Sequence, residues 1–260
     1  MEVKDSIHFK IIVPMYNCSR WAVKCLESVV NQTHKNWQMI ICVEPSQDNT
    51  KDVVRKYLRS KCDSRMVLIE NEVQKHVPRN HIECIKLSEP ENEDVIVLVD
   101  GDDRLSDCQA IAYLNDIYRD PSIWITWGSY VFAHNLKLRG RASEPFPTEK
   151  DEHEGERWWR FSHLKTFRYF LFKGIQDNDL RDLQTHEYYI VAGDMALMFP
   201  MIEMAGRSHS KYIDRVLYVY NQSTPYNDEK THRLLVKRCD SEIRNRPKYI
   251  EKTKEELCQL

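Results

Sequence analysis

Three aspartates crowd around one glycine in the segment Asp94-Val-Ile-Val-Leu-Val-Asp-Gly-Asp-Asp-Arg-Leu105, directly after an apolar run. They are Asp100, Asp102 and Asp103. Burying a carboxylate without a partner costs free energy, and neighbouring carboxylates repel each other. Hard divalent cations such as Mg2+ and Mn2+ take oxygen ligands and often share them with a substrate phosphate. The segment therefore predicts a cation site at the end of a strand, although an acidic turn that caps a helix gives the same pattern.

Composition narrows the class of protein. The chain has 260 residues and a formal net charge of −2, so we expect mainly one domain and no nucleic-acid partner. No apolar stretch approaches the roughly 20 residues that span a bilayer, and the N-terminus lacks the pattern of a signal peptide. The eight cysteines include no C-x-x-C pair, and several lie in apolar runs. We therefore expect a reduced, cytoplasmic protein without a zinc site.

Predicted strands and helices alternate in the first half of the chain. Apolar runs predict strands at 9–15, 37–43, 66–69, the run before Asp100 and 124–132. Helical periodicity predicts helices at 21–30 with Ser19 as N-cap, from 48 onward, at 77–87 with Pro78 in the first turn, and at 106–118. This alternation implies a largely parallel sheet with helices on both faces, whose ligands bind outside the carboxyl ends of the strands.

The second half is less regular. Residues 139–160 are polar and highly charged and predict a surface loop, which is either a plain solvated insertion or a lid. A last strand is expected at 216–220. The tail from Lys230 is helix-prone and rich in Lys and Arg, so it is either a solvated helix or a contact for an acidic partner or a membrane surface.

The order and spacing of these segments match a known family. The matching segments are Lys10–Asn17, Ser28–Ile41, Asp48–Thr50, Pro78–Asn80 and Asp100–Asp103. Over about its first 105 residues the chain resembles family 2 glycosyltransferases, whose fold is α/β and of the GT-A type, with a Rossmann-like, mostly parallel sheet. The resemblance implies a nucleotide-sugar-binding half at 1–135, an acceptor-side half of the same domain at 136–228, and a C-terminal helical tail at 229–260.

The resemblance also implies how a donor would bind. Pro14 and Tyr16 end the first strand, where the family packs the uracil and ribose of a nucleotide sugar, although a tyrosine there can also be core. Glu44 takes the place of an aspartate that accepts the N3–H of the base. Arg79 matches an arginine near the phosphates, where a guanidinium suits a bidentate contact; the alternative is a solvated arginine on a helix face.

Asp100 and Asp102 fill the D-x-D motif of the family, with Gly101 between them. By resemblance, Asp102 coordinates Mn2+ or Mg2+ at the donor diphosphate, while Asp100 reaches the ribose or the water shell of the metal. Such a metal neutralises the charge on the departing nucleoside diphosphate. Asp103 either orients the sugar or caps the following helix.

Inverting transfer needs a general base that deprotonates the acceptor hydroxyl. The segment Ile190–Gly206 resembles the region of the family that supplies this base, with Asp194 in the base position and Gly193 where a glutamate usually precedes it. An acidic residue that opens an apolar helix can also be a simple N-cap. Glu187 and Glu203 are alternatives.

Two further sites have weaker support. The segment Trp158–Phe167 offers aromatic platforms for an acceptor sugar, with His163 or Lys165 near phosphate, or simply packs the second half onto the sheet. His209 or His232 is available as an additional metal ligand, although lone histidines are more often structural or exposed.

These observations together predict a metal-dependent, inverting glycosyltransferase of the hexosyltransferase type. It would move a sugar from a nucleotide-diphosphate donor, UDP-linked by resemblance, to a hydroxyl on a glycan or related acceptor, with peripheral membrane contact as an option. One alternative is a sugar nucleotidyltransferase, which would carry a Gly-rich phosphate loop where this chain has Cys18-Ser-Arg20. Another is an inactive glycan- or nucleotide-binding module, which would lose Asp194 or the D-x-D motif.

Overall fold

The apolar runs of the first half form parallel strands whose carboxyl ends share one edge of the sheet. A computed structural model of the chain describes residues 6–140, 159–226 and 228–260. The strands are β1 (Phe9–Met15), β2 (Trp37–Val43), β3 (Met66–Glu70) and β4 (Val95–Leu98). Both β1 and β4 are buried along their whole length, which explains why they are apolar, apart from Lys10 of β1, instead of alternating.

The second half of the chain adds strands to the same nine-stranded sheet, in the order β3-β2-β1-β4-β8-β6-β9-β5. The added strands are β5 (Arg104–Leu105), β6 (Ile125–Phe132), β7 (Asn135–Arg139), β8 (Lys165–Arg168) and β9 (Ser210–Tyr220). β8 lies between β4 and β6 and is antiparallel to both. β6 and β9 are parallel to each other, and β7 pairs antiparallel with the last residues of β6. The described strands other than β5, β7 and β8 therefore run in one direction, as predicted.

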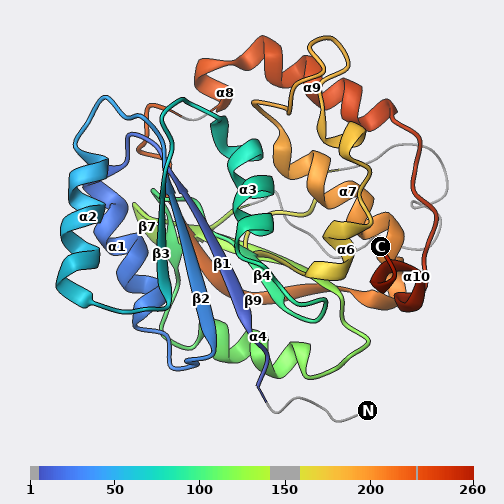
Figure 1. The fold of residues 1–260 in the computed structure, drawn as a ribbon, viewed down its shortest axis with the longest axis horizontal. Coiled ribbons are helices and arrows are strands. Elements are labelled where there is room, and N and C mark those ends of the chain that lie inside the picture. Colours follow the sequence, from blue (N-terminus) through green and yellow to red (C-terminus); the bar gives the residue numbers. More distant parts are fainter. Residues whose placement is uncertain (1–5, 141–158, 227) are drawn as a thin grey trace.

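Helices cover both faces of the sheet (Figure 1). The buried side chains of α1 (Ser19–Val30), α2 (Thr50–Lys61) and α4 (Ala110–Tyr118) join one apolar core. Those of α3 (His76–Leu87), α6 (Tyr169–Lys173) and α7 (Gly193–Ala205) join the core on the opposite face. Successive residues of β4 alternate between the two cores, with Leu98 on the face of α3 and α7. This face is the one on which the candidate base lies.

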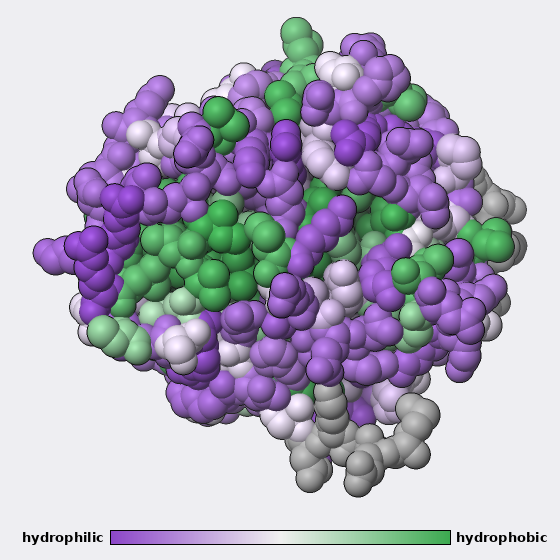
Figure 2. Space-filling view, in the orientation of Figure 1, coloured by the Kyte–Doolittle hydropathy of each residue, from purple (hydrophilic) through white to green (hydrophobic). Residues whose placement is uncertain are grey.

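The chain ends in short helices that pack on the second half. They are α8 (Asp228–Thr231), α9 (Arg233–Asn245) and α10 (Lys254–Cys258), and the 3-10 turns η1 (Asp177–Leu180) and η2 (Arg207–His209) precede them. Figure 2 shows a largely polar face with an apolar area over the β2–β3 edge, where Val67 of β3 is exposed. In the described part of the chain, every helix is too short or too polar to cross a bilayer.

Several predicted boundaries are wrong, for local reasons. Ser19 is the first residue of α1 and not its N-cap, and its backbone N–H donates to Asp48 Oδ2 at 3.0 Å. The helix predicted from residue 106 begins at Ala110, because Arg104–Leu105 pairs with β9 instead. The last strand begins earlier than predicted, at Ser210. Most of the predicted charged loop at 139–160, and Trp158 with it, lies outside the described residues.

Candidate active site

The glycine of the acidic cluster fixes that cluster to the end of β1. The Gly101 N–H donates to the Pro14 carbonyl oxygen at 3.1 Å. A Cβ at Gly101 would come within 2.6 Å of this oxygen and of Met15 Cγ, so only glycine fits without a backbone shift. The loop after β4 is thus held against the carboxyl end of β1, where ligands bind in parallel sheets.

Residues at the end of β9 and directly after it also contact the cluster. The Asn221 N–H donates to Asp103 Oδ1 at 2.6 Å, and the Asp100 N–H donates to the Tyr218 hydroxyl at 3.0 Å. Asp103 is only 3% exposed, and its Oδ2 is buried without a hydrogen-bond partner among the described residues. The cluster therefore has an unmet need for a positive or hydrogen-bonding neighbour.

Burial makes all three carboxyls hard to ionise. It raises the pKa of Asp102 to about 7, with a contribution from the charge of Asp100. It raises the pKa of Asp103 well above its ordinary value, and Asp102 and Asp100 add to this. It also raises the pKa of Asp100, which nearby Lys165 partly offsets and the charge of Asp194 reinforces. A divalent cation would favour the ionised forms, which is the electrostatic situation expected of a metal site.

Asp194 lies in the same site, at the start of α7. Its Oδ2 is 3.4 Å from Nζ of Lys165, whose side chain is only 7% exposed. Lys165 lies opposite Leu98 at the end of β4, so the structure brings the predicted base close to the predicted donor site. Gly193 makes this placement possible, since a Cβ there would lie 2.2 Å from Cβ of Pro78 on α3. The residue that departs from the family pattern at 193 is thus explained by close packing of α7 on α3.

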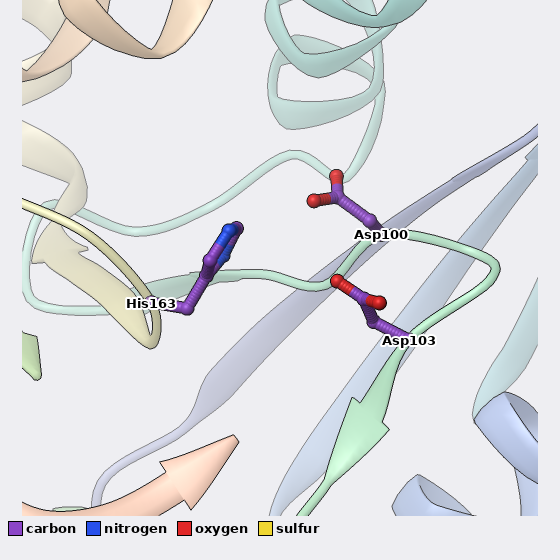
Figure 3. A group of neighbouring side chains, drawn as sticks. All are labelled: Asp100, Asp103 and His163. Carbon is purple, nitrogen blue, oxygen red and sulfur yellow. The ribbon is translucent and has the colours of Figure 1, made fainter. Parts of the chain in front are cut away.

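His163 completes a group that fits a metal ion (Figure 3). One ligand atom each from Asp100, Asp103 and His163 lies within 4.8 Å of the others. Burial lowers the pKa of His163 well below its ordinary value, so its imidazole is neutral and able to ligate. Two carboxylates and an imidazole suit a divalent first-row ion. Asp102 is not in this group, so the prediction that it is a metal ligand stays a prediction.

The loops beside the cluster are ordered by polar contacts. Asn17, in a left-handed conformation with φ 46°, accepts the Gln47 N–H at 2.7 Å through its Oδ1. This contact joins the loops after β1 and β2. The Tyr16 ring is half-buried and meets the edge of Tyr226, with 5.8 Å between ring centroids. The predicted nucleotide-side residues Pro14 and Tyr16 therefore lie beside Gly101, as expected from the strand ends.

Glu44 and Arg79 have partners within the protein. Glu44 is 3% exposed, and its Oε1 accepts the backbone N–H groups of Lys75 at 2.5 Å and His76 at 2.8 Å. It therefore holds the start of α3 next to the end of β2. The Nε of Arg79 donates to Glu83 Oε1 at 2.7 Å, one helical turn away. Both residues lie near the predicted donor edge, and their roles toward a nucleotide stay predictions.

Other predicted candidates among the described residues do not join the group of ligand atoms around Asp100. His209 stacks on Trp124 with 3.7 Å between centroids and lies before β9, at the opposite edge of the sheet. His209 is therefore a structural histidine and not a ligand at the acidic cluster. His232 is exposed and contacts the Thr231 hydroxyl at 2.8 Å. Glu203, near the far end of α7, accepts the Tyr249 N–H at 2.9 Å.

The sequence of the chain matches a family of known proteins. The profile described as "Glycosyl transferase family 2" matches residues 10–178, and the chain belongs to this family. The family that the resemblance implied is thus confirmed, and the sugar nucleotidyltransferase alternative is not supported.

Two bacterial relatives are named as glycosyltransferases. The chain is 32% identical over 93 residues to the putative glycosyltransferase EpsE of Bacillus subtilis (strain 168), a match that covers 36% of this chain and 32% of EpsE. It is 35% identical over 71 residues to UDP-Glc:alpha-D-GlcNAc-diphosphoundecaprenol beta-1,3-glucosyltransferase WfgD of Escherichia coli, with 27% of this chain and 26% of WfgD covered. The matches thus span about a third or less of these relatives.

The fold is that of GT-A enzymes. The structure of S. aureus TarS 1-349 in complex with UDP-GlcNAc has a TM-score of 0.57 at 16% identity, covering 84% of this chain and 59% of that one. Mannosyltransferase PcManGT from Pyrobaculum calidifontis, in complex with GDP-Man and Mn2+, has a TM-score of 0.59 at 15% identity, covering 90% and 62%. At such identities the likeness establishes the fold alone, as the resemblance implied.

Proposed function

We propose that this glycosyltransferase is metal-dependent and inverting, and that it moves a sugar from a nucleoside-diphosphate donor to a hydroxyl group of a glycan or related acceptor. The observation that carries the proposal is that Lys165 pairs with Asp194, from the second half of the chain, and lies opposite Leu98 at the end of β4, which leads into the acidic cluster. A transferase of this kind needs both parts within one site, because the leaving group and the acceptor react at the same sugar carbon.

The carboxylates would hold the cation. Asp100, Asp103 and His163 have the spacing, and Asp102 lies next to them in the chain. When bound, the cation supplies Lewis-acid stabilisation of the departing nucleoside diphosphate. The part of the protein is to fix the ligands: Gly101 fastens the loop to β1, and Tyr218 and Asn221 bind it from β9. Preorganised ligands lower the cost of charge development because they need not reorient during the reaction.

The nucleotide would bind at the ends of β1 and β2. Pro14 and Tyr16 would pack the base and ribose, and buried Glu44 would accept from the base or support the loop that does. Arg79 would turn from Glu83 toward the phosphates. We infer a UDP-sugar because WfgD is named for UDP-Glc and TarS was solved with UDP-GlcNAc, while PcManGT was solved with GDP-Man. The identity of the nucleobase in the donor is therefore part of the test.

Asp194 would be the general base. Its side chain is 37% exposed, so an acceptor hydroxyl can reach it, while Lys165 holds one of its oxygens. Taking the proton from the acceptor as the new bond forms makes the oxygen a better nucleophile. A base on the side of the sugar opposite the diphosphate gives inversion. The predicted cytoplasmic location, membrane contact and division at residues 135 and 228 stay predictions.

The test has two stages. A thermal-shift screen of nucleotide sugars, with and without Mn2+, should single out one donor, since only a bound ligand stabilises the folded state. Asp194→Asn should then lower transfer by about 10²- to 10⁴-fold while leaving the donor dissociation constant within about twofold. Glu187→Gln, at the exposed alternative residue, is the matched control and should stay active. Normal transfer by Asp194→Asn would show that the base lies elsewhere, and retention of the anomeric configuration would exclude inversion.

A further inference from the structure

His163 is far from the acidic cluster in sequence but next to it in space. β8 pairs with β4 in antiparallel register, with Lys165 opposite Leu98. Extending that register by two residues sets His163 opposite Asp100. Figure 3 shows the three side chains converging, with the Asp100 carboxylate directed toward the His163 ring. The pairing of two strands therefore places a nitrogen ligand beside the oxygen ligands.

Tyr218 fixes the plane in which His163 can bind an ion. The two rings stack with 4.4 Å between centroids and 5° between planes. The hydroxyl of the same tyrosine accepts the Asp100 N–H at 3.0 Å. A metal binds an imidazole nitrogen in the plane of the ring, so this stacking fixes the plane that contains the nitrogen lone pair. Residues that orient ligands in this way are typical of metal centres.

Asp103 supplies an independent sign that something is bound here. It is 3% exposed, and its Oδ2 has no hydrogen-bond partner in the described part of the chain. A buried oxygen without a partner costs about 1–3 kcal/mol, or more when charged. Asp100, Asp103 and His163 each offer one ligand atom to the same space. A cation held there would bring a positive charge next to this buried carboxylate.

We propose that His163 is a direct nitrogen ligand of the metal ion, together with Asp100 and Asp103, and that it makes the centre selective for Mn2+ over Mg2+ and Ca2+. The proposal rests on the metal dependence proposed above and names the ligand set and the ion. Carboxylates and water suit Mg2+ and Ca2+ equally well, whereas imidazole suits transition metals. A site with oxygen ligands only, as the D-x-D motif suggests, would not discriminate in this way.

The test is electron paramagnetic resonance of Mn2+ bound to the full chain, with and without UDP. Bound Mn2+ should show electron spin echo modulation from a directly coordinated nitrogen, and the modulation should change when the protein is labelled with 15N-histidine. This comparison uses the unaltered protein, so it does not depend on whether a variant folds. It also separates histidine nitrogen from the nitrogen atoms of UDP.

Variants then identify the histidine. His163→Gln should abolish the 15N-sensitive modulation and weaken Mn2+ binding by about tenfold or more, while changing Mg2+ binding less than about threefold. His209→Gln is the matched control, since that ring stacks on Trp124 at the other edge of the sheet and its loss should change neither quantity. The ratio of Mn2+ to Mg2+ affinity is a readout that a merely structural role would not move.

The outcomes separate this inference from the proposed function. Mn2+ that binds and supports transfer without histidine modulation, or with modulation that survives in His163→Gln, overturns the ligand assignment and leaves the metal-dependent transferase standing. Transfer that is unaffected by EDTA, in a protein that binds no Mn2+ with or without UDP, overturns both. Modulation that disappears in His163→Gln alone supports both.

Discussion

Replacing Asp102 with Asn should stabilise the metal-free protein, and increasingly so as the pH rises. Burial raises the pKa of Asp102 from 3.8 to about 7, and Asp100 contributes. Between these pH values the folded state holds a proton that the unfolded chain has released. Stability therefore falls as the pH rises through this window, and the full stability is present only below about pH 4.

The size of the effect follows from the two pKa values. A rise from 3.8 to about 7 corresponds to about 4 kcal/mol, since each pH unit is worth about 1.4 kcal/mol. The gain from Asp102→Asn should thus be near zero at pH 4 and on the order of 4 kcal/mol above pH 8. Buried His81, whose pKa is lowered to about 3 by burial and by Lys165, acts in the opposite direction below pH 6.5. It is present in both proteins and cancels in the comparison.

Urea denaturation followed by tryptophan fluorescence, from pH 4 to 8.5 in EDTA, measures the difference. Asp116→Asn on α4 is the control, because that aspartate is exposed and its replacement should give a small difference at every pH. Excess Mn2+ should shrink the gain at pH 8, because a cation held beside the cluster offsets the cost of the ionised Asp102, a cost that the Asn variant does not have. A gain that is constant across the pH range, or unchanged by Mn2+, would refute the reasoning.

Two further changes test how the site is held. Gly101→Ala should destabilise the protein by about 1–3 kcal/mol in chemical denaturation, because its Cβ meets the Pro14 carbonyl oxygen at 2.6 Å, whereas Gly128→Ala, whose nearest contact is 3.3 Å, should cost less. An equal cost at the two glycines would contradict the close approach of the loops. Lys165→Met should lower kcat about tenfold or more with the donor KM within about threefold, because Asp194 loses its ion-pair partner, and Lys165→Arg should recover part of kcat. A change confined to the donor KM would place Lys165 with the donor phosphates instead.

The local parts of the fold could be predicted from the sequence. β1 and β2 match the predicted ranges because buried strands are mostly apolar runs, here interrupted only by Lys10 and Gln38. α3 was placed within one residue because Pro78 marks its first turn. β5 was missed because two residues carry no periodicity, and they are strand only through pairing with β9.

For the site, too, the local features could be predicted, whereas the contacts between distant segments could not. Asp100, Gly101 and Asp102 were located by their position after an apolar run, which is local information. The partners Tyr218 and Asn221 were not foreseen, because their contacts depend on where β9 lies in the sheet. The sequence also leaves His163 open between phosphate and packing, because its distance from Asp100 depends on the pairing of β8 with β4. The alternation of Tyr218 and Tyr220 in the last strand was the available signal that this strand presents polar groups to the site.

The central place of β8 has a consequence for how the chain is made. β4 is complete by residue 98, but its second neighbour, β8, begins at Lys165. During synthesis the free edge of β4 stays open until that strand emerges, and an apolar strand with an open edge is a template for pairing with other chains. Such non-local pairing is also slow to form. The nascent protein is therefore most prone to aggregate during this interval, and a chain that stops before residue 165 lacks both the cover of its sheet and the second half of its site.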